Sequence, residues 1–466
     1  MDGSADRTEV EAHGVTDEAY DDGADGTGRG RFDRRTMLGA AAAAGVAAVS
    51  GTGGYLIGRD TGPAGSASAG SAAPTASAAP TAAAIDDRRH QPGIATAQQL
   101  CACIAAFDVL EPHRPNLDEL LARLSALAPA LMRGEPGPAR ANRDVADSGV
   151  TDGLGPADLT MTFGFGPRLF GGDFGPAAAA PKRLVELPAF HGDRLEPRWV
   201  GGDVVVQICA DDPTVVAHAI REVRARVPGI AAARWTHQGF LTSPGDGRTP
   251  RNLFGQLDGT ANLRPGSEEF EAAVWAGADE PDWMAGGSYL VFRKIRMLTP
   301  MWDLATAAEQ NAALGRDRHS GAPLSGGSER TPLDLAKSDA DGRPLIGADA
   351  HVRLAHDAAP MFRRSYNYDH GLVLPASAGI PDEGHTHPPG TAPHDHGPQQ
   401  PGMGHWDNGM LFMTYVRDPG TQFVPLQDTL SRSDKLHGFL QHTGSAVFAV
   451  PGGPFDGERL TRALFG

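Results

Sequence analysis

Residues 349–369 read DAHVRLAHDAAPMFRRSYNYD and combine two histidines, a proline and a pair of arginines. The segment predicts a helix or turn that holds His351 and His356, a break at Pro360, and a strand that carries Arg363 and Arg364. The evenly spaced aromatic residues of this strand are Phe362, Tyr366 and Tyr368. Histidines and arginines are more often ordinary surface or core residues than ligands, so the segment alone assigns no function.

The first 84 residues have the composition of an export signal and a spacer. Arg34 and Arg35 precede the apolar run Gly39–Val49, which is typical of a twin-arginine signal. The alternatives are an uncleaved membrane anchor or an ordinary Ala-rich helix, but the run is short of the ~20 strongly apolar residues that span a bilayer. Residues 61–84 are almost wholly Ser, Ala, Gly, Pro and Thr, so we predict cleavage in or just before them. We therefore expect an exported protein, extracellular or attached to the cell envelope, without stable membrane insertion after cleavage.

The remaining 382 residues carry 46 acidic and 35 basic side chains, a net charge of −11. An acidic chain without a basic block is not expected to bind nucleic acid. Cys101, Cys103 and Cys209 are too few for a disulfide framework, and we predict small, buried, apolar roles for them.

Periodicity predicts an α+β fold. Apolar residues at helical spacing indicate a helix over 117–132 with Asn116 as its N-cap, and Val204–Cys209 predicts a buried strand. A similar succession recurs after residue 250, where we predict a strand over 410–416 and a helix over 434–442. Two ferredoxin-like halves with antiparallel sheets and flanking helices fit this succession, although the pattern alone does not establish them. The predicted parts are the tail (1–84), an N-terminal domain (85–245) and a C-terminal domain (246–466).

A second stretch, RNLFGQLDGTAN at 251–262, contains Gly-x-x-Asp-Gly-Thr. Asp-Gly usually marks only a turn, but this sequence resembles the signature of the dye-decolorizing peroxidases, a haem family. Further stretches resemble the family's motifs in the same order, and the likeness spans residues 88–455. Together with the twin-arginine signal, it indicates the exported branch that includes deferrochelatase-type peroxidases. These stretches are HQPGI at 90–94, GD at 202–203, HVRLA at 351–355, RRSYNY at 363–368, LFMTY at 411–415, FVPLQ at 423–427 and GSAVF at 444–448.

The resemblance implies haem b, iron protoporphyrin IX, bound in the C-terminal half. His351 matches the family's proximal iron ligand, and Asp434 matches a carboxylate that hydrogen-bonds this imidazole in some relatives. Asp258 matches the distal acid–base residue and Arg363 the distal arginine. The resemblance also implies that Phe412, in the LFMTY motif, is one of the haem-binding residues, with His351, Arg363 and Asp434.

Two neighbouring residues offer alternatives to these assignments. His356, five residues after His351, is a weaker candidate for the iron ligand. Arg364 is expected to face the haem propionates or solvent.

The resemblance implies a peroxidase that reduces hydrogen peroxide and oxidises dyes or other small aromatic reductants through a high-valent haem. The alternatives are a deferrochelatase, which releases iron from haem, and a non-catalytic haem or copper carrier. Because bulky dyes cannot reach a buried haem, surface radicals are plausible on some aromatic residues. The candidates are Trp275, Trp283, Trp302, Trp406, Tyr289, Tyr366, Tyr368 and Tyr415.

A Pro/Gly-rich segment near residue 400 is rich in histidine. Such tracts can bind copper, zinc or nickel, but Pro and Gly also favour a polar insertion without fixed ligand geometry. The sequence leaves open whether the chain forms a homo-oligomer. The histidines of the segment are His385, His387, His394, His396 and His405.

Overall fold

The computed structural model describes residues 89–465, apart from 111–113, 140–146, 172–173, 175–176, 243–247 and 375–403. These residues belong to one compact unit, 75–466. The predicted tail with Arg34 and Arg35, the domain boundary at 245/246 and the histidines from His385 to His396 lie outside the described residues. Among the described helices, none is long and apolar enough to cross a membrane.

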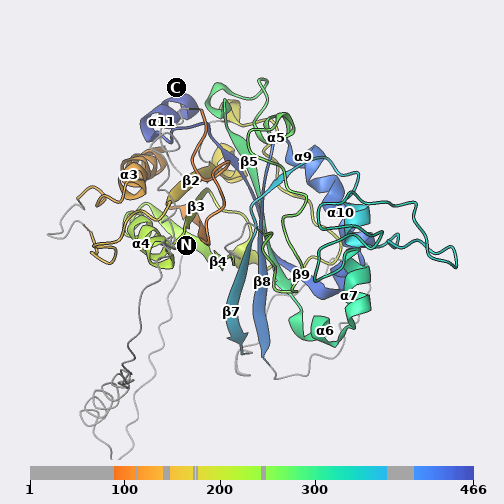
Figure 1. Cartoon of the computed structure of the whole chain (residues 1–466). Helices are drawn as coiled ribbons and strands as arrows, with labels where there is room; N and C mark the ends of the chain where they lie inside the picture. Colours follow the sequence, from red (N-terminus) through yellow and green to blue (C-terminus); the bar gives the residue numbers. More distant parts are fainter. Residues whose placement is uncertain are drawn as a thin grey trace, which may run out of the picture. The chain divides into compact units, whose positions relative to one another are not determined.

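Eight antiparallel strands form a closed barrel (Figure 1). The order is β5-β9-β2-β3-β1-β4-β7-β8, and β8 pairs with β5 to close the ring. A ninth strand, β6 (Phe362–Arg363), adds to the other edge of β8. The barrel strands are β1 (Cys101–Val109), β2 (Thr160–Phe165), β3 (Val204–Ala210), β4 (Ala231–Phe240), β5 (Ser288–Met297), β7 (Tyr366–Val373), β8 (His405–Val416) and β9 (Leu440–Val450).

Helices connect the strands in the same way in both halves. In the first half α3 follows β1 and α4 follows β3, and in the second half α6–α8 follow β5 while α9 and α10 follow β8. The α+β class with antiparallel strands is therefore confirmed. The helices are α3 (Arg114–Met132), α4 (Pro213–Arg224), α5 (Glu268–Val274), α6 (Thr299–Leu304), α7 (Ala307–Leu314), α8 (His351–Leu354), α9 (Pro419–Gln422), α10 (Val424–Ser433) and α11 (Gly457–Phe465), with a 3-10 helix η5 (Lys435–Phe439).

The two sets of four strands join at two short seams. Phe240 of β4 pairs with Asn367 of β7, and Phe165 of β2 pairs with Ala449 of β9. The antiparallel sheets expected for two separate halves thus merge into one continuous barrel.

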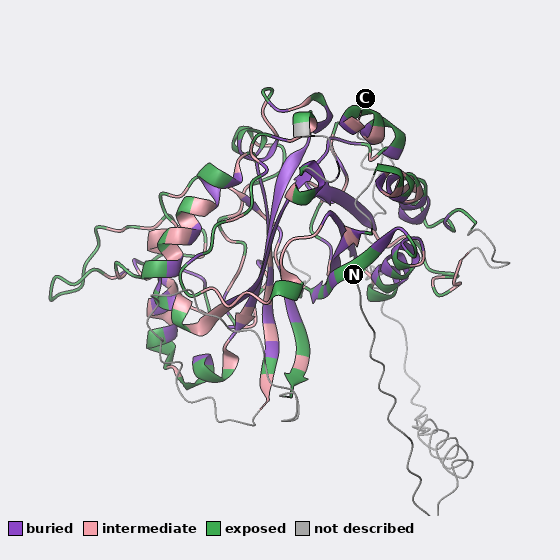
Figure 2. Cartoon of the chain, turned by 180° about the vertical axis from the view of Figure 1, so that it is seen from behind, coloured by how far each residue is buried: buried purple, intermediate pink, exposed green. Residues whose placement is uncertain are grey.

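Strand alternation divides the core into two layers. One face of each strand packs inside the barrel, where Trp235, Phe292 and Phe448 are buried. The opposite face packs under helices such as α3, through Leu117 and Leu124. Figure 2 shows the buried strands and the exposed outer surfaces of the helices.

The three cysteines are free thiols on different faces of this core. Cys103 and Cys209 are buried, as predicted, whereas Cys101 is half-buried. Cys103 packs in the layer under the helices and Cys209 inside the barrel. Burial raises the pKa of the Cys103 thiol to about 12, which keeps it protonated and unreactive.

Two local predictions were wrong. The helix expected over 434–442 is only the 3-10 helix η5, because the chain from Leu440 pairs with β5 and this long-range pairing overrides local helix propensity. Helix α3 starts at Arg114, before the predicted N-cap Asn116, whose side chain donates to the carbonyl of Leu110.

Candidate active site

The loop that carries Asp258 is shaped by hydrogen bonds within residues 250–259. The side-chain oxygen of Asn252 accepts the backbone N–H groups of Phe254 (3.0 Å) and Gln256 (3.3 Å), and the Asp258 N–H donates to the Pro250 carbonyl (2.9 Å). Gly259 then has φ +123°, a conformation that other L residues rarely adopt. The Asp-Gly pair therefore makes a turn, and the turn presents the Asp258 carboxylate.

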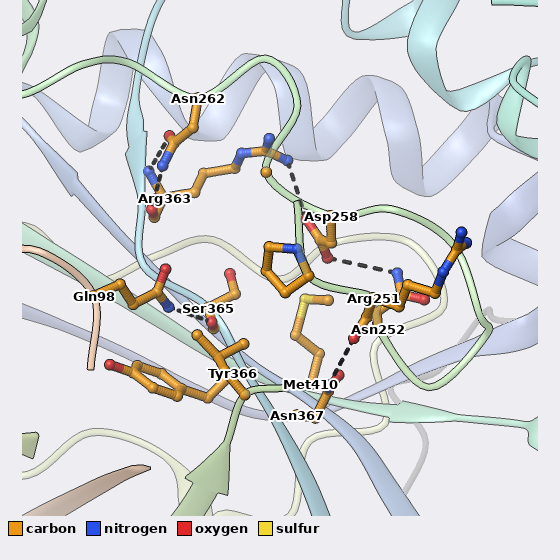
Figure 3. Close-up of a pocket in the computed structure, with 13 residues that line it drawn as sticks. Gln98, Arg251, Asn252, Asp258, Asn262, Arg363, Ser365, Tyr366, Asn367 and Met410 are labelled. Atoms are coloured by element: carbon orange, nitrogen blue, oxygen red, sulfur yellow. Dashed lines mark hydrogen bonds and ion pairs between the residues drawn. The ribbon is translucent and has the colours of Figure 1, made fainter. Parts of the chain in front are cut away.

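Arg363 faces Asp258 across a small cavity (Figure 3). Its Nη1 lies 3.9 Å from Asp258 Oδ1, and the two side chains are 32% and 27% exposed. The separation is too long for a direct hydrogen bond but suits one oxygen atom bound between them. Asn252 Nδ2 lies 3.5 Å from the other carboxylate oxygen of Asp258. The site thus presents a permanent cation and a carboxylate to one small oxygen-containing molecule between them.

The cavity between these residues has a volume of about 40 Å³. Met410 of β8 and Tyr366 of β7 form part of its wall, so the site sits against the barrel. The lining residues are Gln98, Leu241, Pro250, Arg251, Asn252, Asp258, Gly259, Asn262, Arg363, Ser365, Tyr366, Asn367 and Met410.

His351 and Asp434 form a second pair of functional groups. His351 begins α8, and its Nδ1 lies 2.7 Å from Oδ2 of Asp434, a carboxylate only 3% exposed. The other oxygen, Oδ1, accepts the N–H of Leu436 at 2.8 Å. An ionised carboxylate can only accept, so we assign the proton to Nδ1. This tautomer leaves the Nε2 lone pair of His351 available as a metal ligand.

One apolar cluster touches the segments that carry both pairs. Trp302 of α6 stacks on Phe254 (4.4 Å between ring centroids) and donates from Nε1 to its carbonyl (3.1 Å). The same indole meets Phe439 of η5 edge-on at 5.0 Å. The Asp258 loop and the segment that follows Asp434 therefore pack on a single side chain.

Phe412 lies on β8 in a row of half-buried residues. Met410 and Phe412 point to one face of the strand and are half-buried, whereas Leu411 and Met413 are fully buried inside the barrel. The ring centroids of Phe412 and of Phe423, which precedes α10, lie 6.0 Å apart. This face of β8 offers an apolar surface beside Arg363, which pairs with β8 through β6.

Two residues next to the proposed site residues, His356 and Arg364, do not belong to the site. His356 is exposed and follows α8. Arg364 was expected at the propionates or in solvent, and this expectation was wrong. Arg364 is fully buried and donates to the carbonyls of Thr96 (2.6 Å) and Ala97 (3.2 Å), because strand alternation turns it into the barrel, away from Arg363.

A separate group of possible metal ligands lies in the N-terminal half, where Asp147, His218 and Glu222 have ligand atoms within 4.8 Å of one another. His218 Nε2 already lies 2.9 Å from Asp147, and the Arg226 guanidinium lies 2.8 Å from Glu222. We interpret these residues as an ion-pair network, because the positive charge of Arg226 opposes a cation.

The aromatic residues proposed as radical sites differ in exposure. Trp406, near the start of β8, is 50% exposed, whereas the other seven candidates are buried. Direct contact with a bulky reductant is therefore open to Trp406 alone among these eight.

Comparison with known proteins identifies the family. Residues 91–241 match the N-terminal part and residues 249–455 the C-terminal part of the Dyp-type peroxidases. The chain therefore belongs to the DyP-type peroxidase family, a family of haem peroxidases, as its motifs indicated.

Individual relatives agree with this assignment. The chain is 38% identical to a dye-decolorizing peroxidase from Thermobifida fusca, over 78% of this chain and 80% of the relative. It is 33% identical to a deferrochelatase from Escherichia coli (strain K12), over 78% and 82%. Its fold matches a DyP-type peroxidase from Streptomyces coelicolor (TM-score 0.70, 36% identity, 84% and 100% covered) and ferric DtpA from Streptomyces lividans (0.69, 37%, 80% and 95%).

The residues present fit the haem that this family implies. A carboxylate-paired imidazole with Nε2 available is a suitable ligand for haem iron. The half-buried Met410 and Phe412 provide apolar contact for a macrocycle, and Asp258 with Arg363 supplies polar groups for a bound oxygen species. His351 would hold the iron, and Phe412 and Arg363 would line the cofactor.

Proposed function

We propose that this chain is an exported haem b peroxidase that reduces hydrogen peroxide and oxidises dyes or other small aromatic reductants. The facing Asp258 and Arg363, 3.9 Å apart, carry the proposal. When bound, haem supplies the iron that takes up the two oxidising equivalents of peroxide. Two electrons and two protons then convert hydrogen peroxide into two water molecules, with each electron drawn from an aromatic donor.

Asp258 and Arg363 have different roles in the reaction of hydrogen peroxide. Asp258 accepts the first proton of hydrogen peroxide and returns it to the leaving oxygen as the O–O bond breaks. Arg363, always protonated, stabilises the negative charge that develops on the oxygens. His351 holds the cofactor, and Asp434 keeps its imidazole in the ligating tautomer.

The test is rapid mixing of the haem-loaded protein with hydrogen peroxide while the Soret band is followed. We expect Asp258→Ala and Arg363→Ala to retain haem but slow the spectral change by about 10²–10⁴-fold, the usual contribution of such groups. His351→Ala should lose the haem-ligand spectrum. Asp341→Ala and Arg343→Ala are matched controls, because that pair, 3.1 Å apart, is exposed and outside the cavity. Unchanged rates in both distal variants would refute the roles given to Asp258 and Arg363, whereas stable haem without a peroxide response in the wild type would favour the carrier.

The second candidate is removal of iron from haem, which is favoured by the relatives named deferrochelatase at 33% identity. Release of metal-free protoporphyrin, detected by its fluorescence during anaerobic incubation, would support it. Haem recovered intact with peroxide turnover would exclude it.

We further infer that each half is a ferredoxin-like unit and that haem binds in the second. The order β4-β1-β3-β2 in the first half and β7-β8-β5-β9 in the second support this, since both have β-α-β-β-α-β connectivity. The five proposed site residues all follow residue 246.

Export rests on Arg34 and Arg35 and the apolar run after them. Loss of export in the Arg34→Lys/Arg35→Lys double variant, measured by cell fractionation, would test it. Metal binding by the histidine-rich segment is a separate prediction, and equilibrium dialysis with copper on a variant lacking 385–403 would decide it.

A further inference from the structure

The strand that carries Arg363 has one edge bound by side-chain amides instead of another strand (Figure 3). On its inner edge β6 pairs with β8. On its outer edge Asn262 Oδ1 accepts the Arg363 N–H (2.9 Å), and Asn262 Nδ2 donates to the Arg363 carbonyl (2.7 Å). Beyond the end of β6, before β7 begins, Gln98 Nε2 donates to the Ser365 carbonyl (2.7 Å).

A further amide, on the next strand β7, ties the start of the Asp258 loop to the barrel. Asn367 Nδ2 donates to the Arg251 carbonyl at 3.0 Å. Arg251 precedes Asp258 in the loop and Asn262 follows it, so the loop is anchored on both sides of the carboxylate. The anchor after Asp258 binds β6, which bears the arginine that faces this carboxylate, and the anchor before it binds β7.

We propose that Asn262 is a positioning residue that sets the separation between Asp258 and Arg363, with Asn367 as the second anchor. The inference rests on the proposed peroxidase function, in which these two side chains act on one molecule. A carboxamide is suited to this task because it donates and accepts at the same time, and two bonds to one residue fix both distance and orientation. Strand β6 is only two residues long, so the ladder with β8 provides little other restraint.

The alternative is that Asn262 only stabilises the fold. A matched control exists in the N-terminal half, where Gln91 binds both backbone groups of Phe163 in the same way. Its Oε1 accepts the Phe163 N–H (2.9 Å) and its Nε2 donates to the Phe163 carbonyl (3.0 Å). Gln91→Ala therefore breaks an equivalent pair of bonds, together with one from Gln91 Nε2 to the Pro451 carbonyl (3.0 Å), far from the Asp258 loop in sequence and outside the cavity lining.

The decisive measurement is the dissociation constant of fluoride from the ferric, haem-loaded protein, which reports the distal hydrogen-bond donors without turnover. We expect Asn262→Ala to weaken fluoride binding by about 10²-fold, the size of effect that a misplacement of ~1 Å has on an active-site group. Arg363→Ala should weaken it at least as much, and Gln91→Ala should leave it unchanged.

A double variant tests whether Asn262 acts through Arg363. Asn262→Ala combined with Arg363→Ala should bind fluoride no more weakly than Arg363→Ala alone, because the two residues form one unit. In the haem-free protein, the amide of Arg363 should exchange with deuterium faster after Asn262→Ala. Additive losses, or an unchanged fluoride affinity in Asn262→Ala, would overturn the proposal. Failure of the wild-type protein to respond to peroxide would refute the peroxidase function instead, and the fluoride and exchange data would still decide the role of Asn262.

Discussion

Replacing Asp434 by Asn tests how far the carboxylate controls the imidazole of His351. The substitution is isosteric, and the amide oxygen can still accept the Leu436 N–H that Asp434 Oδ1 now accepts at 2.8 Å. At the other position an NH₂ group replaces an oxygen 2.7 Å from His351 Nδ1. Because an amide N–H cannot accept a proton, Nδ1 must become the acceptor, and Nε2 then carries the hydrogen that blocks iron binding.

The size of the effect follows from the burial of the pair. Asp434 is 3% exposed, so solvent does not replace the lost bond. A hydrogen bond to a charged group contributes about 1.5–3 kcal/mol, and loss of such a partner of a metal ligand costs about 10–100-fold in affinity. The two figures agree, since a factor of ten corresponds to about 1.4 kcal/mol. We therefore expect haem to dissociate from Asp434→Asn about 10–100 times faster.

The assay is transfer of haem from the loaded protein to an excess of a haem-free globin, followed by the Soret band. Asp349→Asn is the control, because it removes a charge two residues from His351, from a side chain that is 54% exposed and 3.7 Å from Lys435. Equal dissociation rates for Asp434→Asn and the wild type would refute the reasoning, as would an equal loss in the control.

Two further perturbations test the barrel and the cluster under the site. Burial lowers the pKa of His237 to about 3, below its unfolded value of about 6.5, so its neutral form stabilises the fold above pH 6.5 and this stabilisation is lost as pH falls toward 3. Denaturant titration measures the free energy of unfolding of His237→Phe and of the wild type between about pH 6.5 and 3. In this range the wild type should lose about 1.4 kcal/mol more per pH unit than the variant. Parallel curves for the two proteins would contradict this. Trp302→Ala should cost about 3–5 kcal/mol in the same assay, against less than about 0.5 kcal/mol for the half-exposed Trp406→Ala.

The sequence was most informative where function depends on a short motif. The turn at Asp258 and the segment with His351 and Arg363 each carry a recognisable motif, and local chain geometry determines how that motif folds. The prediction that Asp434 partners His351 came from resemblance alone. In the structure Asp434 Oδ2 lies 2.7 Å from His351 Nδ1. The two hydrogen bonds of Asn262 to the Arg363 backbone were not predicted, although Asn262 stands in the quoted motif, because an amide that binds backbone leaves no pattern of charge or hydrophobicity.

Barrel closure was beyond local reasoning for a different physical reason. Each seam rests on one residue pair, Phe240 with Asn367 and Phe165 with Ala449, and the partners are far apart in sequence. Periodicity reports which face of a strand is apolar but not which strand lies beside it. The wrong prediction that Arg364 faces the propionates or solvent has the same origin. Its burial depends on the carbonyls of Thr96 and Ala97, which are far away in sequence.

The position of Trp302 explains why the two sides of the site should respond differently to substitution. Its indole packs on Phe254 of the Asp258 loop and on Phe439 of η5, just beyond Asp434. In the proposed mechanism, Asn262 acts on the distal side and Asp434 on the side of the iron ligand. A cavity at Trp302, in contrast, removes support from both, because close-packed interiors relax toward an empty volume. Trp302→Ala should therefore weaken fluoride binding and speed haem loss together, whereas Asn262→Ala should change the first and Asp434→Asn the second.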